Sequence, residues 1–320
     1  MTIGRVAGYH HPAYARSFLD HGNPVELPHS GSWIVERQIP GSDLWDAMGC
    51  YPLFTSHRWA RLALDLPALA PRLVTLVLVT DPFSEVTAPE RRRMFDVVWP
   101  FKEHYTIDLA RFDARAMPRT HRRNVARALR SVQVEACPAP RGLLDEWIEL
   151  YDQLIARHDI VGMRAFSREA FAHQLSVPGL AAFRATREGA VVGLHLWYVQ
   201  DDVAYAHLGA TSARGYDVMA SYALYWHAMA WLRGRVRWVD LGSSPGEPDN
   251  PASAGLRRFK AGWANATRQT YLCGRIFQPE AYAHLVAERG ATGLGYFPAY
   301  RCGEFTSQAP PVPRAHGSGG

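Results

Sequence analysis

Arginines are concentrated in residues 119–130, a segment that holds five of them and no acidic residue. At 3.6 residues per helical turn, Arg119, Arg123 and Arg127 share one face. Such a stripe could bind phosphate groups, because a guanidinium donates two hydrogen bonds at once. It could equally be the solvated face of a connecting helix, which is the simpler interpretation of the segment alone.

A second group of side chains lies in residues 203–217, where a strand-like segment leads through small residues into an apolar helix. Gly209 and Gly215 would let the backbone approach a ligand closely. Free N–H groups at the start of the helix could bind an anion or an oxyanion. Tyr205 and His207 lie on the strand itself. Glycine-containing connections between strand and helix are common, so a purely structural role stays open.

A third group begins at Asp240, which ends an apolar strand and precedes a loop rich in Gly, Ser and Pro. A segment of interleaved basic and aromatic side chains follows. These are Arg257, Arg258, Phe259, Lys260 and Trp263. Cations beside aromatic rings suit a charged, partly planar ligand. They also suit ordinary surface packing, in which the aliphatic stems cover apolar surface.

Motifs of several other chemistries are missing from the sequence. No G-x-S-x-G, H-E-x-x-H, P-loop or dinucleotide-binding fingerprint stands in a suitable context, so hydride transfer, metallohydrolysis and P-loop chemistry have no support. The 4 cysteines and 14 histidines lack metal-ligand spacing. We therefore expect no metal site and reduced thiols.

The composition bounds the class of protein. With 48% hydrophobic and 20% charged residues, the chain is globular rather than disordered, collagen-like or coiled-coil. Its 320 residues suggest about two domains, at roughly 150 residues per domain. The formal net charge of +5 is a weak indication of a polyanionic partner.

No targeting or membrane segment is evident. The N-terminal segment lacks the apolar core of a signal peptide. Residues 218–232 are apolar but too short to span a bilayer, so they predict a buried helix. We expect a cytoplasmic protein without a membrane span. The sequence leaves the oligomeric state open.

Hydrophobic periodicity predicts the elements that must position these side chains. In the first half we expect helices over 12–19, 57–66 and 113–132, strands over 32–39, 73–79 and 104–109, and a loop over 40–54. In the second half we expect helices over 143–158, 167–174 and 217–232, and strands over 181–186, 191–199, 203–208, 236–241 and 268–276. This order predicts a mixed α/β fold of the α+β type.

Four of these pieces, in this order, resemble the FemAB/FemX-like branch of the GNAT acyltransferase superfamily. They are residues 121–124, the strand 205–210 with its turn 212–215, residues 239–242 and residues 255–262. The last contains the Phe-Lys pair followed by Gly that is common in this branch. Residues 49–52, which include Tyr51, are a weaker match to the substrate-side loop of its first domain.

The resemblance implies two tandem GNAT-like domains without the coiled-coil arm of some members. Residues 1–135 would form the acceptor-side domain, completed by about 285–306, with 296–301 returning to it. Residues 136–284 would form the donor-side, catalytic domain. Residues 307–320, rich in Pro and then Gly, are predicted to be disordered.

The resemblance also implies an acyltransferase that forms an amide bond. We expect no bound cofactor, with aminoacyl-tRNA as co-substrate and an amine of a small molecule, peptide or nucleotide-linked cell-wall precursor as acceptor. Acyl-CoA or a carrier-bound thioester is the alternative donor. The usual [RQ]-x-x-G-x-[GA] pyrophosphate loop is degenerate at residues 212–217, which weakens the case for CoA. A third alternative is a non-catalytic module that binds RNA or a nucleotide sugar.

Roles for single residues follow from the same resemblance. Lys260 would stabilise the oxyanion, and Phe259 would pack against the acyl end or the terminal adenosine. Asp240, His207 and Tyr205 are candidates to orient or deprotonate the amine, although His207 could equally be a core residue. The remaining residues would bind substrate: Arg122, Arg123, Arg257 and Arg258 at phosphates, Tyr51 and Lys102 on the acceptor side, and Tyr216.

Overall fold

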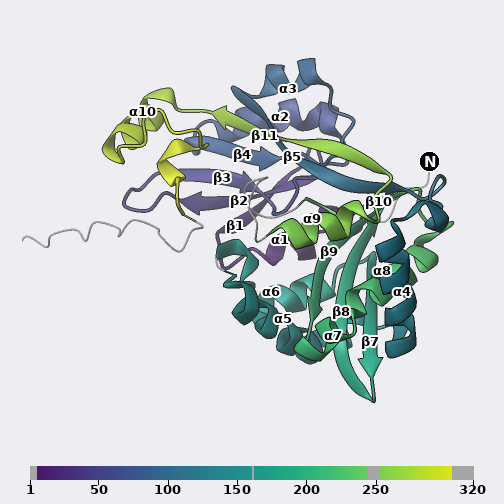
Figure 1. Cartoon of the computed structure of the whole chain (residues 1–320). Coiled ribbons are helices and arrows are strands. Elements are labelled where there is room, and N and C mark those ends of the chain that lie inside the picture. Colours follow the sequence, from purple (N-terminus) through teal and green to yellow (C-terminus); the bar gives the residue numbers. More distant parts are fainter. Residues whose placement is uncertain (1–5, 161, 244–252, 305–320) are drawn as a thin grey trace, which may run out of the picture. The chain divides into compact units, whose positions relative to one another are not determined.

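The computed structural model describes residues 6–160, 162–243 and 253–304 (Figure 1). The chain forms two compact units. Unit 1 consists of Met1–Ser17, Phe101–Ile160 and Phe166–Thr270, and unit 2 consists of Phe18–Pro100, Val161–Ala165 and Tyr271–Gly320. The boundary predicted between residues 135 and 136 falls inside unit 1, within a strand. The tail predicted over 307–320 lies outside the described residues.

Unit 1 is built on strands in the order β5-β10-β9-β8-β7-β6. Their bounds are β5 (Val97–Asp108), β6 (Gln133–Cys137), β7 (Leu180–Arg187), β8 (Ala190–Gln200), β9 (Val203–Thr211) and β10 (Trp238–Asp240). Strands β6 to β9 pair antiparallel, whereas β10 is parallel to β9 and antiparallel to β5. Tight turns with positive φ at Glu188, Gly189 and Asp201 connect the meander, as their residue types predicted.

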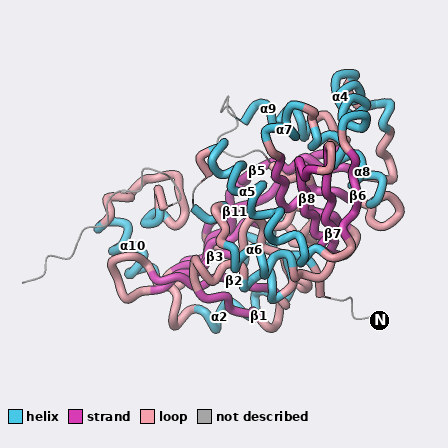
Figure 2. Tube along the Cα trace, turned by 90° about the horizontal axis from the view of Figure 1, so that it is seen from below, coloured by secondary structure: helices cyan, strands magenta, loops and turns pink. Residues whose placement is uncertain are grey.

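Helices cover both faces of the strands in unit 1. They are α1 (Pro12–Arg16), α4 (Arg119–Ser131), α5 (Leu144–His158), α6 (Arg168–Leu175), α7 (Ala213–Asp217), α8 (Ala220–Leu232) and α9 (Ala254–Ala261). Figures 1 and 2 show α5 and α6 on one side of β7 and β8, and α4 and α8 on the other. Ile107, Ala204 and Val239 pack into the core with α4 and α8. Because side chains alternate along a strand, the neighbouring residues of β5, β9 and β10 point to the opposite face.

Unit 2 repeats this strand pattern. Its strands follow the order β1-β2-β3-β4-β11, with bounds β1 (Asn23–Leu27), β2 (Ser32–Gln38), β3 (Trp45–Gly49), β4 (Thr75–Val79) and β11 (Ala266–Ile276). An antiparallel meander is again followed by a parallel strand and then an antiparallel one. The helices are α2 (Leu62–Leu69), α3 (Ala88–Met94) and α10 (Pro279–Glu288). This shared pattern agrees with two tandem GNAT-like domains, although the sequence shows no repeat.

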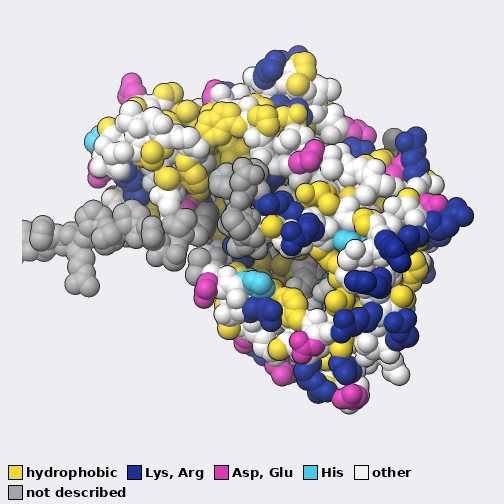
Figure 3. All heavy atoms as spheres, in the orientation of Figure 1, with side chains coloured by type: hydrophobic (Ala, Val, Ile, Leu, Met, Phe, Trp, Pro, Cys, Tyr) yellow, Lys and Arg dark blue, Asp and Glu magenta, His cyan; other side chains and the backbone are white. Residues whose placement is uncertain are grey.

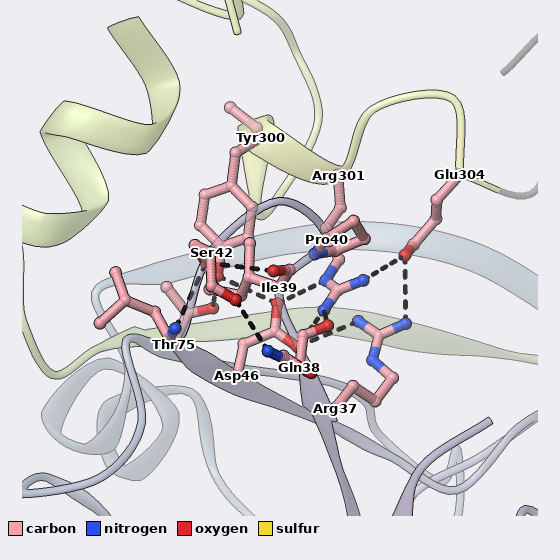
Figure 4. A network of polar contacts seen from close by, with 12 residues as sticks. Arg37, Gln38, Ile39, Pro40, Ser42, Asp46, Thr75, Tyr300, Arg301 and Glu304 are labelled. Atoms are coloured by element: carbon pink, nitrogen blue, oxygen red, sulfur yellow. Dashed lines mark hydrogen bonds and ion pairs between the residues drawn. The ribbon is translucent and has the colours of Figure 1, made fainter. Parts of the chain in front are cut away.

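The C-terminal part of unit 2 is held by a buried polar network (Figure 4). The Asp46 carboxylate, which is 0% exposed, accepts hydrogen bonds from Arg301 at 2.5 and 2.9 Å and from the Tyr300 hydroxyl at 3.0 Å. Arg37 pairs with Asp46 at 3.4 Å and with Glu304 at 3.2 Å. This network fixes residues 299–304 against β2 and β3 and so overlaps residues 296–301, which were predicted to return to the first domain.

The mixed α/β fold is confirmed, but several elements differ from their predictions, and β1, β6, α3, α9 and α10 were not predicted as elements. β3 lies in the segment predicted as loop, because pairing with strands on both sides stabilises this short, Gly- and Pro-flanked stretch. β5 begins at Val97 rather than at 104, despite Pro100. The helix predicted from residue 113 begins at Arg119, because Pro118 disfavours helical backbone in the residue before it. Among the described residues, no helix combines the length and apolarity needed to cross a membrane.

Candidate active site

The candidate site of unit 1 begins where two parallel strands separate. β9 and β10 are in register as far as Tyr205 and Asp240. Beyond that point the chain follows β5, because Leu241 donates to the Tyr105 carbonyl and Gly242 accepts from the Tyr105 N–H. β9 instead continues to Thr211 in contact with β8. The sheet of unit 1 is therefore open beside Asp240.

The corresponding point of unit 2 is closed. After β3 and β4, the Phe54 N–H donates to the Val79 carbonyl at 2.7 Å, and Asp81 donates to the Phe54 carbonyl at 3.2 Å. The Phe54 side chain, only 1% exposed, lies in the core. The pattern of strands is repeated in both units, but the opening that could admit an acyl group belongs to unit 1.

His104 and Asp240 form a buried pair at this opening. His104 Nδ1 lies 2.8 Å from Asp240 Oδ2 and 3.0 Å from Oδ1. Asp240 Oδ1 also accepts a 2.7 Å hydrogen bond from the Gly242 N–H. A carboxylate can only accept, so Nδ1 carries a proton, and in the neutral ring Nε2 carries the lone pair. No described residue provides a hydrogen-bond partner for Nε2.

The ammonium group of Lys260 lies close to Asp240. It extends from α9, and its Nζ donates a 2.6 Å hydrogen bond to the Ser243 carbonyl, three residues after Asp240. Burial lowers the pKa of Lys260 from 10.5 to about 8, the Asp240 charge acts to raise it, and Lys102 acts to lower it. Lys102 on β5, Asp240 on β10 and Lys260 on α9 therefore lie close enough for their charges to interact.

Aromatic packing holds α9, and with it Lys260, in position. The Phe259 ring lies 4.8 Å from Tyr225 and 4.9 Å from Tyr222, both on α8. His121 Nε2 on α4 lies 2.9 Å from the Phe259 carbonyl oxygen. Phe259, predicted to pack against substrate, makes these contacts with the core of unit 1.

The other candidates for the base lie on the same face but make different contacts. Tyr205 is beside Asp240 on the neighbouring strand, with its ring 5.4 Å from that of Tyr9. His207 Nδ1 contacts the Tyr9 hydroxyl at 3.2 Å, and Nε2 contacts Gln174 Oε1 at 3.1 Å. Burial lowers the pKa of His207 to about 3. Both of its ring nitrogens are occupied, which favours the core alternative for this residue.

The predicted phosphate-binding arginines lie on the surface of unit 1. Arg122 and Arg123 are exposed on α4, and Arg258 is exposed on α9. Arg257 donates to Ser253 Oγ at 2.8 Å. In Figure 3, Lys and Arg side chains gather over the part of unit 1 where Figure 1 labels α4, and again near α9.

The two predicted substrate tyrosines belong to other elements. Tyr216 lies in α7, and the Arg157 guanidinium is 4.0 Å from its ring centre. Tyr51 belongs to unit 2, and burial raises the pKa of its hydroxyl. The structure thus gathers Lys260, Asp240 and Lys102 around one point and adds His104, which the sequence analysis did not select. The strand alternation of Lys102, His104 and Thr106 was its only signal.

The residues at the degenerate pyrophosphate loop cap a short helix. Ser212 Oγ accepts from the Gly215 N–H at 3.2 Å, and Arg214 pairs with Glu188 at 2.8 Å. A Cβ at Gly215 would lie 2.2 Å from the Val192 carbonyl oxygen, so close packing explains this glycine. Within the described ranges, no three His, Cys, Asp or Glu side chains are placed to hold a metal ion.

Known proteins resemble the chain at two levels. Residues 113–261 match the family model of an acetyltransferase (GNAT) domain. The whole structure resembles that of FemX, with a TM-score of 0.64 over 85% of this chain and 92% of that chain at 12% identity. No protein of curated function matches the sequence.

Two further structures have the same fold. The C-terminal domain of a protein assigned as a lysylphosphatidylglycerol synthetase from Agrobacterium fabrum has a TM-score of 0.60 over 84% of this chain and 88% of its own, at 19% identity. L-PGS from Bacillus licheniformis has a TM-score of 0.57 over 89% of this chain and 98% of its own, at 15% identity. Residues 113–261 therefore match a GNAT domain, and the chain shares the fold of FemX, as the resemblance to the FemAB/FemX-like branch implied.

Proposed function

We propose that this enzyme transfers an aminoacyl group from aminoacyl-tRNA to an amine and so forms an amide bond. The observation that carries the proposal is the Lys260 ammonium, held by the Ser243 carbonyl beside the point where β9 and β10 separate. A fixed cation in a poorly solvated site stabilises the negative charge that develops on an attacked carbonyl oxygen.

The reaction is an aminolysis of an ester. The acceptor nitrogen attacks the acyl carbon, a C–N bond forms, and the bond from carbon to the ribose oxygen breaks. The nitrogen loses one proton and the leaving oxygen gains one, so no oxidant, reductant or metal is needed. Lys260 would neutralise the tetrahedral oxyanion between these two steps.

The charge of α4 supports a polyanionic donor. Its five arginines are exposed, and none of them forms an ion pair with another described residue. The contact between His121 and Phe259 places this helix against α9, which carries Arg257, Arg258 and Lys260. We propose that Arg122, Arg123, Arg257 and Arg258 bind donor phosphates, because arginines that contact the phosphates of a nucleic acid displace its counterions.

A thioester donor, acyl-CoA or carrier-bound, is the second candidate, favoured by the acetyltransferase model that matches residues 113–261. The contacts of the degenerate loop favour RNA instead. In that loop Ser212 Oγ already accepts from the Gly215 N–H, which is therefore not free for a pyrophosphate. A non-catalytic module that binds RNA or a nucleotide sugar would need neither a desolvated lysine nor an open sheet edge.

The acceptor is proposed as an amine of a small molecule, a peptide or a nucleotide-linked cell-wall precursor. We assign Tyr51, Lys102 and Tyr216 to substrate binding. Aminoacyl-tRNA is found in the cytoplasm, so we propose that the reaction takes place there.

The test supplies each donor to the purified chain. Bulk tRNA charged with radiolabelled amino acids, acetyl-CoA and longer acyl-CoAs are each offered with a panel of free amines, lysine-containing peptides and a peptidoglycan-precursor nucleotide. We expect an alkali-stable amide from charged tRNA only. Product from acyl-CoA alone would select the second donor. Salt-dependent RNA binding without turnover from any donor would contradict enzymatic transfer.

A further inference from the structure

We propose that His104 is the general base of this site and that Asp240 is the residue that positions it. The inference rests on the acyl transfer proposed above, and it concerns the proton that the acceptor amine must lose. His207 and Tyr205, the other candidates on this face, make other contacts, whereas Nε2 of His104 has no hydrogen-bond partner among the described residues.

Geometry selects the tautomer of His104. The Asp240 carboxylate accepts from Nδ1 at 2.8 Å, which leaves the lone pair on Nε2. His104 is 7% and Asp240 2% exposed, so neither side chain can turn freely toward solvent. Asp240 is itself fixed by the Gly242 N–H at 2.7 Å. A buried carboxylate that orients an imidazole and stabilises its protonated form is the arrangement that general-base catalysis requires.

The surroundings supply the other charges of the reaction. Lys260 on α9 and Lys102 on β5 lie close enough to influence each other's charge, and Tyr205 on β9 is beside Asp240. Further along the same strands, Asp108 pairs with Arg237 at 3.3 Å, and Arg268 of β11 stacks on Trp238 at 4.5 Å. Lys260 and Lys102 carry positive charge, and the Asp240 carboxylate in direct contact with His104 carries negative charge.

The proton path is then complete. As the C–N bond forms, His104 Nε2 takes the proton from the attacking nitrogen. As the bond to the leaving oxygen breaks, the imidazolium returns that proton to the oxygen. Lys260 remains protonated throughout and stabilises the oxyanion. His104 and Lys260 therefore have different roles, and variants of the two residues should respond differently to pH.

Two variants and a control test the roles of His104 and Asp240 in the intact chain. His104→Asn keeps an N–H toward Asp240 but removes the base. Asp240→Asn keeps the contact with Gly242 through its oxygen and presents an N–H to His104 Nδ1, which selects the wrong tautomer. Thr106→Val is the matched control, because Thr106 lies on the same strand face as His104 and its buried Oγ1 has no hydrogen-bond partner among the described residues.

The measurement is the pH profile of kcat/KM, with whichever donor the wild-type chain uses and two acceptor amines of different pKa. We expect an acidic limb in the wild type that keeps its position with both amines. His104→Asn should lose that limb and about 10²- to 10⁴-fold in rate. Asp240→Asn should lose a similar factor, and Thr106→Val should match the wild type.

An outcome in which His104→Asn keeps the wild-type rate and limb would overturn the role of His104 while leaving acyl transfer intact. A wild-type chain inactive with charged tRNA and with every acyl-CoA would instead refute the proposed function. Nitrogen-15 NMR of the histidine rings provides a readout independent of turnover. In the neutral ring of His104 we expect the proton on Nδ1 and not on Nε2, and the opposite tautomer would overturn the inference.

Discussion

Lys260 is useful to the proposed reaction only while it keeps its proton. Its ammonium group is poorly solvated, which lowers its pKa to about 8, and Asp240 limits that decrease. Held to the Ser243 carbonyl, it has lost the free rotation of a surface lysine before substrate arrives. A hydrogen-bond donor that is held in place in this way can stabilise the transition state by about 3–4 kcal/mol.

This position predicts an alkaline limit to activity. The protonated form of Lys260 is the active one, so transfer should fall as the pH rises through about 8. Lys260→Arg keeps the charge, because an arginine stays protonated above pH 12. The alkaline limb measured for kcat should therefore move upward or vanish in Lys260→Arg. A limb at the same pH in both proteins would assign it to another group.

Single residues also mark how far the sequence could lead. Lys260 and Asp240 were selected from local motifs, a Phe-Lys pair before Gly and the end of an apolar strand. His104 was not, because its partner lies 136 positions away and no local pattern indicates which strands become neighbours. His207 shows the converse limit: a histidine on a strand gives no sign that Tyr9 and Gln174 will occupy both of its nitrogens.

At the scale of elements, α9 depends on a glycine at its end. A Cβ on Gly262 would lie 2.1 Å from the ring of His121, the residue that connects α4 to the Phe259 carbonyl. This contact requires the two helices to pack closely. The Gly that follows the Phe-Lys pair in the sequence therefore has a steric reason.

Two glycines of the same segment provide a matched comparison. Gly262→Ala should destabilise the fold by about 1–3 kcal/mol through overpacking and reduce transfer by displacing Lys260. A Cβ on Gly255, in the first turn of α9, would meet no atom of another described residue within 4 Å. Gly255→Ala should therefore be neutral or stabilising by up to about 1 kcal/mol. Denaturant unfolding compares the two, and equal effects would exclude the steric explanation.

The arginines of α4 make a prediction about binding rather than stability. Replacing both Arg122 and Arg123 by Ala should reduce the slope of log affinity for tRNA against log salt by about two. Arg92→Ala with Arg93→Ala is the charge-matched control, because these residues are exposed on α3 of unit 2. Filter binding over a range of salt concentrations measures both. The same reduction in the two double variants would mean that net charge, and not α4, sets the affinity.

Elements were predictable from the sequence where local chemistry decides them. The meander β7 to β9 was predicted because its turn residues accept positive φ, and α5 because its apolar residues follow a helical period. β3 was missed because the five residues Trp45–Gly49 have no decisive pattern of their own. Its strand conformation comes from pairing with β2 and β4, which only the complete sheet provides.

At the scale of the whole molecule, one strand pattern is used twice with different outcomes. In unit 1 the parallel strands separate and leave Asp240 beside an opening, whereas in unit 2 Phe54 closes the equivalent place. The tandem arrangement was implied by family resemblance and not by any internal repeat. The backbone pattern is the same in both units, but the side chains at the opening differ. The two halves therefore share the strand pattern without detectable sequence similarity.

The stability of unit 2 should depend strongly on Asp46. Asp46→Ala would leave the buried guanidinium of Arg301 without its main partner and weaken the attachment of residues 299–304. We expect a loss of about 3–5 kcal/mol in the free energy of unfolding of this unit. Asp43→Ala, at an exposed position in the same segment, should change it by less than about 0.5 kcal/mol. Similar unfolding curves for the two variants would contradict a stabilising role for the network.

The most direct test of the account is single-turnover transfer by the wild type and Lys260→Ala, followed as alkali-stable amide formed from radiolabelled aminoacyl-tRNA and an acceptor amine. Circular dichroism and thermal unfolding establish that the variant is folded. We predict rapid amide formation by the wild type and a rate about 10²- to 10³-fold lower in the variant. A folded Lys260→Ala protein that transfers at the wild-type rate would contradict the assignment of the active site.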